Sequence, residues 1–510
     1  MGENLVSWGR RMTMLAEEHP DKTAIVFVPQ DGSPHRHVSW RELDGTANQV
    51  ARLMAERDVN DESMVVIGLW NCVEHYFASI AAWKLGALVL PLRGEMPEYE
   101  RDQILALGQP TLVVTNWDNV PYPTLSIAEM LEKAPSYSDE PLPDITANPG
   151  YSMGSGGSTG RPKIIVIPGP RARDPDEPQA RTWDLGYRRK QVQLIAGPLY
   201  HNSPFGFSHS GLFDDQMLVV MERFNAAMVP DLVEQYKVNF SFMAPTMMSR
   251  IIKVPGIWER DFSSFKGLLH TAAPCPAWLK RDWIKLLGPE KVWEAFGSTE
   301  AVGATVIRGD EWLKHPGSVG KPTPESELKI LDANLNEVPT GVVGEIFFRP
   351  DTDDHTYEYI GSPRAKSTAD GFTSVGDMGW VDEEGYLFPA DRRVDLIITG
   401  GANVYPAEVE AALTELDEIG DVAVIGVPDD DWGKRVHAVI QPRDYLNPPS
   451  IRDLDAHCRQ RLMSYKVPKS YEFVEELPRQ PSGKIRRSGM VKEREAGWTE
   501  NMIRAKENAN

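Results

Sequence analysis

The first third of the chain alternates helix patterns with strand patterns, and this alternation limits the folds open to it. Residues 40–56 and 73–85 carry apolar side chains at helical spacing, whereas residues 64–70 and 87–92 are short apolar runs rich in Val, Ile and Leu. Short apolar strands separated by helices form parallel sheets that are covered by helices. The alternation resumes after residue 190, so we expect one large α/β unit that extends to about residue 390.

The sequence changes character near residue 391. The charged run DRRVD, residues 391–395, separates two apolar segments. The residues that follow it show a compact α+β pattern, with strands expected at 422–427 and 436–440. A break of this kind is typical of a domain boundary. We therefore predict two domains, residues 1–391 and 392–510, with a hinge near residues 391–395.

Charge and cysteine content exclude several classes of function. The chain has 54 Lys and Arg against 74 Asp and Glu, a formal charge of −20. Binding to nucleic acid or to an anionic membrane draws on massed basic residues, so neither partner is expected. No apolar run approaches the ~20 residues of a spanning helix, which excludes membrane insertion. The three cysteines lack CxxC spacing, and a cytoplasmic protein without disulfides is the simplest expectation.

The segment YSMGSGGSTGRPKIIV, residues 151–166, predicts a phosphate-binding loop. Small residues let backbone N–H groups approach phosphate oxygens, Ser158 and Thr159 add hydroxyl donors, and Lys163 adds a positive charge. The Walker spacing GxxxxGK[ST] is absent, which disfavours a GTPase or a simple ATPase. A flexible linker is the alternative, but linkers rarely end in Arg-Pro-Lys and an aliphatic strand.

A second motif, EAFGSTE at residues 294–300, places Gly297 next to Ser298, Thr299 and the carboxylate of Glu300. A carboxylate is a hard oxygen ligand, and it suits a Mg²⁺ ion that is held mostly by waters and phosphates. Taken alone, a Ser-Thr-Glu turn is more often a helix cap.

Two further motifs carry polar groups that suit a nucleotide. In SVGDMGW, residues 374–380, Asp377 can accept hydrogen bonds from ribose hydroxyls, and Arg392 can reach the same sugar or a phosphate. The run RQPSGKIRRSGMVK, residues 479–492, holds five basic residues and no acid. Its Pro-Ser-Gly turn exposes Lys484, which can meet charge on a transferring phosphoryl group. Taken singly, Asp377 also suits a turn and Arg392 a charged, solvent-exposed linker. The run 479–492 also suits a basic tail on the surface.

In this order and spacing, the motifs resemble those of the adenylate-forming superfamily, which contains acyl-CoA synthetases, luciferases and the adenylation domains of peptide synthetases. The resemblance covers nearly the whole chain and includes PLYHNSP at residues 198–204, HTAAPCP at residues 270–276 and GGANVYPAEVE at residues 400–410. It implies an α/β fold in which a large N-terminal domain, made of two doubly wound α/β subdomains and a small β-barrel, precedes a small mobile α+β C-terminal domain.

The resemblance also implies a reaction and its residues. A carboxylic acid attacks ATP to give an acyl-adenylate and pyrophosphate; the C-terminal domain then rotates, and the thiol of CoA attacks the acyl group. Catalysis falls to Lys484, Thr299 and Glu300, and Glu300 also holds Mg²⁺. The residues that the resemblance assigns to ATP and CoA are Ser158, Thr159, Lys163, Gly297, Ser298, Asp377, Arg392, Gly400 and Gly401.

The branch of the superfamily is a separate inference. The chain ends soon after Lys484 without a carrier domain, and PLYHNSPFGFSHS lacks the Asp of amino-acid adenylation domains, so a free acid passed to CoA is favoured. The sequence GGSTGRPKIIV looks closest to ligases for bulky hydrophobic acids such as bile-acid, steroid or terpenoid carboxylates. The expected partners are this acid, ATP and CoA, and a homodimer is the oligomer considered. The acyl pocket is expected from His201, Asn202, Phe205 and Phe207, with core packing as the alternative for both Phe residues.

Three departures from the family pattern leave other functions open. Ile164 replaces a Gly, and Val394 replaces an Asp or Lys at the hinge. Residues 168–190 are interpreted as an exposed insertion, which would oppose the binding of ATP if its carboxylates folded inward. The acidic residues concerned are Asp174, Asp176 and Glu177. One alternative is an enzyme with weak or absent adenylation that mainly transfers a supplied acyl-adenylate to CoA. The others are a luciferase-like adenylate oxidase and a non-catalytic nucleotide-binding protein.

Overall fold

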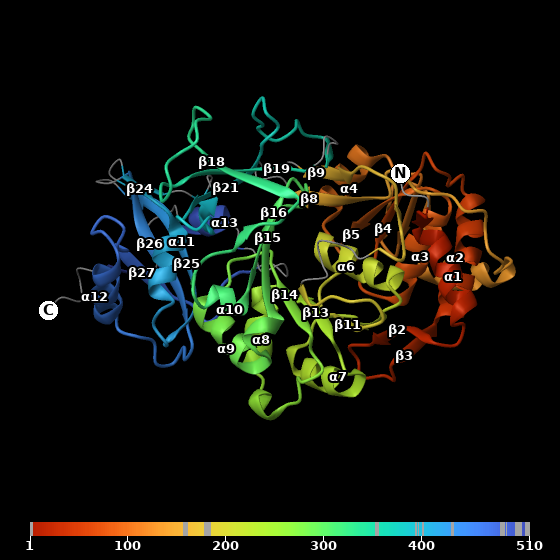
Figure 1. The fold of residues 1–510 in the computed structure, drawn as a ribbon, viewed down its shortest axis with the longest axis horizontal. Helices are drawn as coiled ribbons and strands as arrows, with labels where there is room; N and C mark the ends of the chain where they lie inside the picture. The colour runs from red at the N-terminus through yellow and green to blue at the C-terminus, as the bar shows by residue number, and fades with distance from the viewer. Residues whose placement is uncertain are drawn as a thin grey trace.

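The computed structural model describes residues 4–156, 162–177, 185–351, 356–392, 395, 397–399, 402–429, 433–479, 485, 487–494 and 502–504. These residues form a large N-terminal domain, on the right and in the centre of Figure 1, and a small C-terminal domain in blue on the left. Within them, no helix is both long enough and apolar enough to cross a membrane.

The predicted helices and strands of the first third form where expected. Helix α2 (Trp40–Ala55) begins at Trp40 because Ser39 Oγ accepts a hydrogen bond from the Glu42 amide at 3.1 Å, which caps the first turn. The other helices of the large domain are α1 (Trp8–Glu18), α3 (Val73–Lys84), α4 (Glu98–Gly108), α5 (Ile127–Lys133), α6 (Asn202–Phe213), α7 (Val229–Tyr236), α8 (Pro245–Ile252), α9 (Ala277–Leu287) and α10 (Gly309–Trp312).

A mixed sheet carries the segment that the sequence predicts to bind phosphate. In the described part of the chain it has seven strands, in the order β20-β9-β8-β5-β4-β6-β7. The strands β8, β5, β4, β6 and β7 run parallel, whereas β9 and β20 pair antiparallel at one edge. Their bounds are β20 (Glu358–Ile360), β9 (Pro162–Ile167), β8 (Tyr151–Gly156), β5 (Leu88–Leu92), β4 (Met64–Gly68), β6 (Leu112–Thr115) and β7 (Thr124–Leu125).

A second sheet carries the Ser-Thr-Glu motif. It has nine strands among the described residues, in the order β17-β16-β15-β14-β13-β11-β12-β2-β3, and its six central strands are parallel. Their bounds are β17 (Lys321–Pro322), β16 (Ala304–Arg308), β15 (Val292–Gly297), β14 (Gly267–His270), β13 (Phe240–Met243), β11 (Val192–Ile195), β12 (Met217–Met221), β2 (Thr23–Val28) and β3 (Arg36–Ser39).

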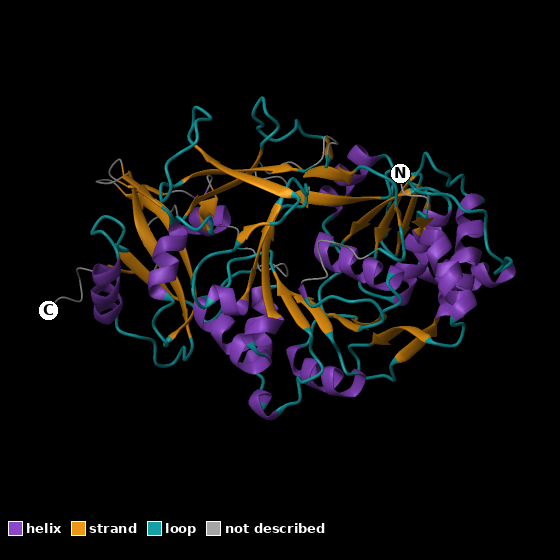
Figure 2. Cartoon of the chain, viewed as in Figure 1, coloured by secondary structure: helices purple, strands orange, loops and turns teal. Residues whose placement is uncertain are grey.

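The core clusters show how these sheets and helices are layered. Along β4, Val65 and Ile67 pack into a cluster with α1, α2, α3 and α6, whereas Met64 and Val66 pack into another cluster with α4. The first cluster also contains Ile25 of β2, so these four helices lie between the two sheets, and α7, α8 and α9 cover the far face of the nine-stranded sheet. Figure 2 shows the same alternation of purple helices and orange sheets. Both sheets are therefore covered on two faces, as the apolar strand patterns predict.

Two smaller sheets complete the chain. The first, where the sequence led us to expect a small barrel, pairs four described strands antiparallel: β18 (Ser326–Leu331), β19 (Gly344–Pro350), β21 (Thr373–Val381) and β22 (Leu387–Arg392). The second belongs to the C-terminal domain and contains β25 (Ile419–Asp429), β26 (Gly433–Pro442), β27 (Ser470–Phe473) and β28 (Met502–Arg504).

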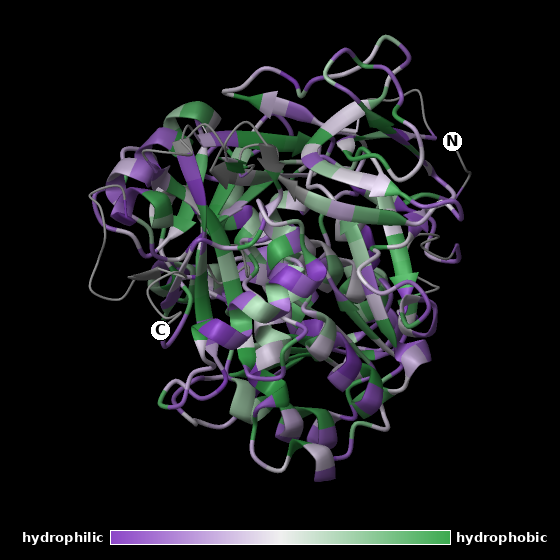
Figure 3. Cartoon of the chain, turned by 90° about the vertical axis from the view of Figure 1, so that its left-hand side faces the viewer, coloured by the Kyte–Doolittle hydropathy of each residue, from purple (hydrophilic) through white to green (hydrophobic). Residues whose placement is uncertain are grey.

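The C-terminal domain has a core of its own. The hairpin β23 (Ile397–Thr399) and β24 (Ala402–Val404) and the helices α11 (Pro406–Leu413) and α12 (Ile451–Arg461) pack against one face of its sheet, and α13 (Arg487–Arg494) packs against the other. In Figure 3, which views the molecule from this side, green hydrophobic residues run along the strands and purple residues mark much of the outer helices. A separate core is what an independent domain requires; the boundary at residue 391 stays a prediction.

The insertion at residues 168–190 is only partly exposed in its described parts, 168–177 and 185–190: residues 168–170, 176 and 177 are exposed, whereas Leu185 and Tyr187 are buried. Residues Ala172–Arg173 form β10, which pairs antiparallel with β1 (Val6–Ser7), and Tyr187 is fully buried. Arg173 and the Tyr187 hydroxyl both donate hydrogen bonds of 2.7 Å to the Asp214 carboxylate. These polar contacts were invisible in the sequence because their partners are distant along the chain.

The contacts of Asp174 and Asp176 lie within the insertion itself. Asp176 Oδ1 lies 3.5 Å from Arg189 Nη1, and Asp174 accepts a hydrogen bond from the Asp176 amide at 2.8 Å. The insertion follows the end of β9 opposite to Lys163, roughly 13 Å further along an extended strand. The expected obstruction of ATP by Asp174 and Asp176 therefore finds no support in these contacts.

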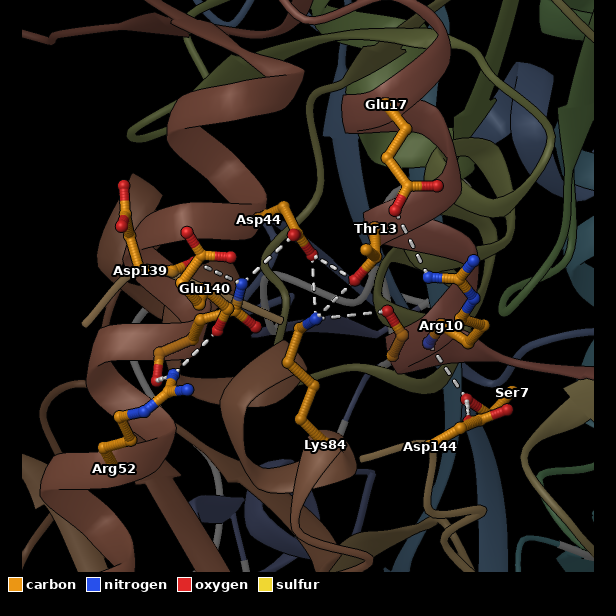
Figure 4. A network of polar contacts seen from close by, with 12 residues as sticks. Ser7, Arg10, Thr13, Glu17, Asp44, Arg52, Lys84, Asp139, Glu140 and Asp144 are labelled. Carbon is orange, nitrogen blue, oxygen red and sulfur yellow. Dashed lines mark hydrogen bonds and ion pairs between the residues drawn. The ribbon is translucent and has the colours of Figure 1, made fainter. Parts of the chain in front are cut away.

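A buried ion pair joins the helices that lie between the two sheets (Figure 4). Lys84 Nζ lies 2.8 Å from Asp44 Oδ1 and also donates a hydrogen bond to Thr13 Oγ1 at 3.0 Å, while Asn48 donates to Asp44 Oδ2 at 3.1 Å. Lys84 and Asp44 are only 4% and 5% exposed. Because both charges are paired and hydrogen-bonded, the burial of each is compensated by the other.

Asp44→Ala should lower the free energy of unfolding of the large domain by about 3–5 kcal/mol, because it leaves the Lys84 ammonium buried without a counter-charge. Urea unfolding followed by tryptophan fluorescence measures this loss. The double variant Asp44→Leu, Lys84→Met removes both charges and should recover most of the stability. A loss below ~1 kcal/mol for Asp44→Ala, the usual value of an exposed pair, would contradict the buried-pair interpretation.

Candidate active site

Lys163, Glu300 and Tyr359 come together from segments of the two large sheets. Lys163 is the second residue of β9, Glu300 lies three residues beyond the end of β15, and Tyr359 is the middle residue of β20. Lys163 Nζ lies 3.3 Å from Glu300 Oε1, and the Tyr359 hydroxyl donates a hydrogen bond of 2.5 Å to the same oxygen. The Lys163 ammonium also lies 3.7 Å from the centre of the Tyr359 ring.

Local backbone structure holds these three side chains together. Strand β20 pairs antiparallel with β9, so that Tyr359 lies opposite Ile165 and close to Lys163. Glu300 follows a turn in which the Ala301 amide donates to the Ser298 carbonyl at 3.1 Å. Among the described residues no helix begins at this turn, so the helix-cap alternative for the Ser-Thr-Glu motif is wrong.

The Glu300 carboxylate is held in its charged form. Burial alone would raise its pKa, but the hydrogen bond from Tyr359 and the charge of Lys163 outweigh burial and leave the pKa below its ordinary value. Both contacts go to Oε1. An ionised carboxylate at this position fits the ligand set of Mg²⁺.

The residues just before Glu300 offer further polar groups. The Ser298 hydroxyl is buried and has no hydrogen-bond partner among the described residues. A buried hydroxyl without a partner costs about 1–3 kcal/mol, so such groups in native proteins usually meet water or a ligand. Gly297 is exposed and Thr299 is half-buried beside it. The four predicted residues 297–300 are consecutive, and through Glu300 they lie beside Lys163.

Asp377 and Arg392, the predicted ribose-binding pair, face each other across two strands. They are paired positions in the antiparallel ladder between β21 and β22. Directly opposed residues of such a ladder have Cβ atoms about 4.5–5.5 Å apart, close enough to serve one ligand. The side chain of Arg392 lies outside the described part of the structure, so its contacts do not enter this comparison.

The residues expected to form an acyl pocket divide into two groups. His201 precedes α6, Asn202 begins it, and both are half-buried; Asn202 accepts a hydrogen bond from the Tyr151 hydroxyl at 3.2 Å. Phe205 has no exposed surface and lies in the core between the two sheets, which favours its core-packing alternative. Phe207 is half-buried and stacks on Phe242 at 5.5 Å, so it stays a candidate for the pocket.

Ile164 also proves to be a core residue. Its side chain is fully buried in the cluster between β9 and α4. The Ile that replaces the usual Gly is thus accommodated by apolar packing. The other predicted site residues lie outside the described residues, as does the expected hinge position Val394. These residues are Ser158, Thr159, Gly400, Gly401 and Lys484.

A second polar cluster, which sequence reasoning missed, lies next to His201. The Arg93 guanidinium lies 5.4 Å from the Tyr200 ring, and that of Arg223 lies 4.4 Å from the Trp70 ring. Neither arginine has a carboxylate within ion-pair distance among the described residues. Arg93 directly follows β5, and Trp70 and Arg223 lie two residues beyond the ends of β4 and β12. Ligands of open α/β sheets bind at these carboxyl ends.

Tyr359 is the other functional residue that sequence reasoning missed. A weak signal existed, because Tyr357 and Tyr359 alternate as residues on one face of a strand do. The pairing of that strand with β9 could not be read from the sequence, since almost 200 residues separate the two strands, and only this pairing brings the hydroxyl to Glu300.

Comparisons with known proteins identify the family of the chain. The family of AMP-binding enzymes matches residues 13–352, and the AMP-binding enzyme C-terminal domain matches residues 408–484. The fatty acid–[acyl-carrier-protein] ligase ScoC of Streptomyces coeruleorubidus is 28% identical over 477 residues, 89% of this chain and 91% of the relative. A long-chain-fatty-acid–CoA ligase of Bacillus subtilis strain 168 is 31% identical over 538 residues, 94% of this chain and 93% of the relative.

Among solved structures, the fold is similar to that of o-succinylbenzoate CoA synthetase from Bacillus subtilis in complex with its acyl-adenylate intermediate. The TM-score is 0.80 at 24% sequence identity, covering 95% of this chain and 98% of the other. This likeness bears on the fold alone, whereas the family match covers most of the chain and both predicted domains. The protein therefore belongs to the family of AMP-binding enzymes, as its motifs predict.

Proposed function

We propose that the protein is an AMP-forming acid–thiol ligase, which activates a carboxylic acid with ATP and then passes the acyl group to CoA. The observation that carries the proposal is the cluster of Lys163, Glu300 and Tyr359. It places an ammonium group next to an ionised carboxylate. Phosphoryl chemistry depends on such positioning and charge neutralisation more than on covalent catalysis. The names of the relatives, ligases of CoA or acyl-carrier protein, point the same way.

The residues of this chain then divide the work of adenylation. Ser158, Thr159 and Lys163 hold the triphosphate, with the unpartnered hydroxyl of Ser298 as a further donor, and Thr299 holds the α-phosphate region. Asp377 and Arg392 hold the ribose. Glu300 would hold Mg²⁺, which neutralises phosphate charge when bound. The carboxylate oxygen of the acid attacks the α-phosphorus, and pyrophosphate leaves.

The second half-reaction requires the small domain to turn. We propose that it rotates about residues 391–395, between the domains 1–391 and 392–510, and that Gly400 and Gly401 then line the path of the pantetheine thiol. In the present arrangement, Arg250 donates a hydrogen bond of 2.6 Å to Glu476, and Arg443 lies 4.5 Å from the Trp278 ring. These two contacts join the domains and would break on rotation.

The cluster next to His201 supports CoA as the thiol. Arg93 and Arg223 offer positive charge that no described carboxylate neutralises, at the carboxyl ends of strands. CoA carries three phosphate groups on its nucleotide portion, and arginine is well suited to bind phosphate. The net charge of −20 does not prevent the binding of CoA phosphates. Salt screens the field of distant acidic residues over about 8 Å, so nearby cations have the larger effect.

For the acid, we propose a bulky hydrophobic carboxylate held near His201, Asn202 and Phe207. Incubation with ATP, CoA and a panel of bile-acid, steroid, terpenoid, aromatic and fatty acids, followed by mass spectrometry of CoA thioesters, tests it. Preference for a polycyclic acid would support the proposal, whereas preference for a linear fatty acid would overturn the substrate class and leave the ligase reaction standing. An acyl-carrier protein with its pantetheine arm, used as the alternative thiol, tests the acceptor.

An enzyme that mainly transfers a supplied adenylate is the competing proposal. This proposal was based on the expectation that carboxylates of the insertion oppose the binding of ATP. Asp174 and Asp176 instead interact within the insertion itself. Turnover with acid, ATP and CoA should therefore match turnover with synthetic acyl-adenylate and CoA to within about tenfold. Oxygen uptake without CoA would instead indicate an adenylate oxidase. A cytoplasmic location and a homodimer stay predictions.

Tyr359→Phe should slow adenylation roughly tenfold, because it removes a hydrogen bond to a charged group. It should also raise the pKa of Glu300, since burial then acts with less opposition, so activity should be lost at a higher pH as the solution is acidified. Pyrophosphate exchange measured against pH reports both effects. Tyr357→Phe is the control, because that hydroxyl accepts from the Ala365 amide at 3.1 Å. If the activity of Tyr359→Phe falls at the same acidic pH as that of wild type, the assigned contact between Tyr359 and Glu300 is wrong.

A further inference from the structure

An apolar cluster rich in aromatic residues lies on the face of the nine-stranded sheet opposite α7, α8 and α9. Its buried members are Leu185, Tyr187, Phe240, Phe242 and Leu269, and its partly exposed members are Phe207, Trp293, Ala295 and Val306. Phe207 belongs to α6, the helix that begins at Asn202, and its ring stacks on that of Phe242 at 5.5 Å. We call this set of residues the Phe207 cluster.

Strand β15 connects the Phe207 cluster to the candidate active site. Side chains two residues apart on a strand lie on the same face, so Trp293, Ala295 and Gly297 share one face of β15. Val292 lies on the other face and packs with α8 and α9. Gly297 is exposed and is the first residue of the predicted site run 297–300. The apolar surface to which Ala295 contributes therefore reaches to within two residues of that run.

The segment 185–187 lies at the other end of the cluster. It packs against Gly267, the first residue of β14, whereas the candidate site lies beyond the carboxyl ends of the strands. A Cβ atom on Gly186 would lie 2.6 Å from the Gly267 Cα, so the two backbones approach closely because both residues are glycine. The ring of Tyr187 lies 5.4 Å from that of Phe240 and 6.2 Å from that of Phe207.

Polar contacts fix this segment in place. The Tyr187 hydroxyl donates a hydrogen bond of 2.7 Å to Asp214, and Gln191 Nε2 donates one of 3.0 Å to the Gly186 carbonyl. Tyr187 has no exposed surface. Because its hydroxyl is engaged by Asp214, the ring is the part of Tyr187 that contacts the cluster. The far end of the Phe207 cluster is therefore apolar and held by several contacts.

A cavity of about 460 Å³ borders the same segment. It is lined by Gly186, Arg188, Gln191, Asn239 and Lys266. Arg188 and Lys266 are exposed, so the cavity opens at the surface. Leu185 and Tyr187 contribute to the cluster, while Gly186 between them lines the cavity. The segment 185–187 thus separates the Phe207 cluster from this cavity.

We propose that the Phe207 cluster holds the hydrophobic part of the acid, and that Tyr187 is a specificity-determining residue that limits the length of the acid. The inference rests on the proposed ligase function. An acid that fits between Gly297 and Tyr187 buries apolar surface against Phe207 and its neighbours. A longer acid would have to displace a buried ring that Asp214 holds, and a close-packed interior resists such overpacking.

Tyr187→Leu and Tyr187→Ala remove the ring and should extend the range of accepted acids toward the cavity. The probes are ω-phenylalkanoic acids of increasing chain length, and kcat/KM for CoA thioester formation is measured for each. The first acid that wild type rejects should gain at least about tenfold in kcat/KM relative to the shortest acid. Tyr187→Phe keeps the ring and loses only the hydroxyl, so it should keep the length profile of wild type.

Two further variants separate acid selection from support of the fold. Phe265→Leu is the matched control, because Phe265 is fully buried in the cluster on the opposite face of the same sheet. It should lower the melting temperature and leave the length profile unchanged. Ala295→Leu removes no buried ring and adds bulk next to Gly297. It should lower kcat/KM for the acids about tenfold, while the KM for ATP changes by less than about threefold.

The outcomes that overturn the proposal are distinct. An unchanged length profile in Tyr187→Leu and Tyr187→Ala, or an equal loss for every acid, would overturn the role of Tyr187. Wild-type kcat/KM for every acid in Ala295→Leu would overturn the placement of the acyl group, and this variant decides the matter if the Tyr187 variants do not fold. If wild type gives neither thioester nor pyrophosphate exchange with any acid, the proposed function itself fails, and this inference fails with it.

Discussion

Lys484→Ala is expected to lower adenylation by on the order of 10³-fold, the usual effect of losing one group that stabilises transition-state charge. The lysine would bridge oxygens of the attacking carboxylate and of the α-phosphate, where negative charge is concentrated as the new bond forms. No other residue of the run 479–492 is proposed to take its place. Pyrophosphate exchange with the best acid of the panel measures the loss.

The same variant should still transfer the acyl group of a supplied adenylate to CoA at a rate within about threefold of wild type. This second rate is the internal control, because an unfolded or misassembled variant would lose both activities. If thioester formation from the adenylate also disappears while the melting temperature is unchanged, Lys484 serves both half-reactions and the assigned division of labour is wrong.

Glu300→Gln should lower adenylation by about 10²-fold and raise the concentration of MgATP needed for half-maximal rate, because it replaces a metal-binding carboxylate with a neutral amide. The lowered pKa of Glu300 means that wild type already carries the full negative charge at neutral pH. The variant therefore removes a whole charge next to the Lys163 ammonium. Titration of pyrophosphate exchange with ATP at several Mg²⁺ concentrations measures both effects.

The control for Glu300 is Glu358→Gln, which removes an exposed carboxylate from the strand that also carries Tyr359. This control should leave the MgATP dependence unchanged. If Glu300→Gln also leaves it unchanged, Glu300 is not a ligand of the metal. If it lowers only the melting temperature, the contact of Glu300 with Lys163 is structural.

The sequence predicted most of the fold because local patterns sufficed for it. Apolar periodicity placed α2, β4, α3 and β5 within a few residues, whereas the domain boundary at residue 391 stays a prediction. The predicted Asp377 and Arg392 occupy paired positions of one ladder. The comparisons confirm the family, whereas the roles of the individual site residues stay predictions until the variants are measured.

What the sequence could not predict depends on contacts between distant segments. Tyr359 acquires its role only because β20 pairs with β9. The insertion at 168–190 looked exposed because its charged residues and prolines lack periodicity, yet Tyr187 is buried and Arg173 pairs with Asp214. Phe205 looked like a pocket residue by its place in the motif, but packing between the two sheets buries it. Side-chain environment, more than secondary structure, is what a single sequence leaves open.

Transfer of ¹⁸O from the acid to AMP tests the adenylation reaction most directly. The acid found in the thioester screen, labelled with ¹⁸O in both carboxylate oxygens, is incubated with the enzyme, ATP and CoA. Adenylation forms a bond between one labelled oxygen and the α-phosphorus, and attack of the thiol then breaks the bond between that oxygen and the acyl carbon. We therefore expect one ¹⁸O in AMP, one in the thioester and none in pyrophosphate. Unlabelled AMP, or label in inorganic phosphate alongside ADP, would contradict an acyl-adenylate mechanism.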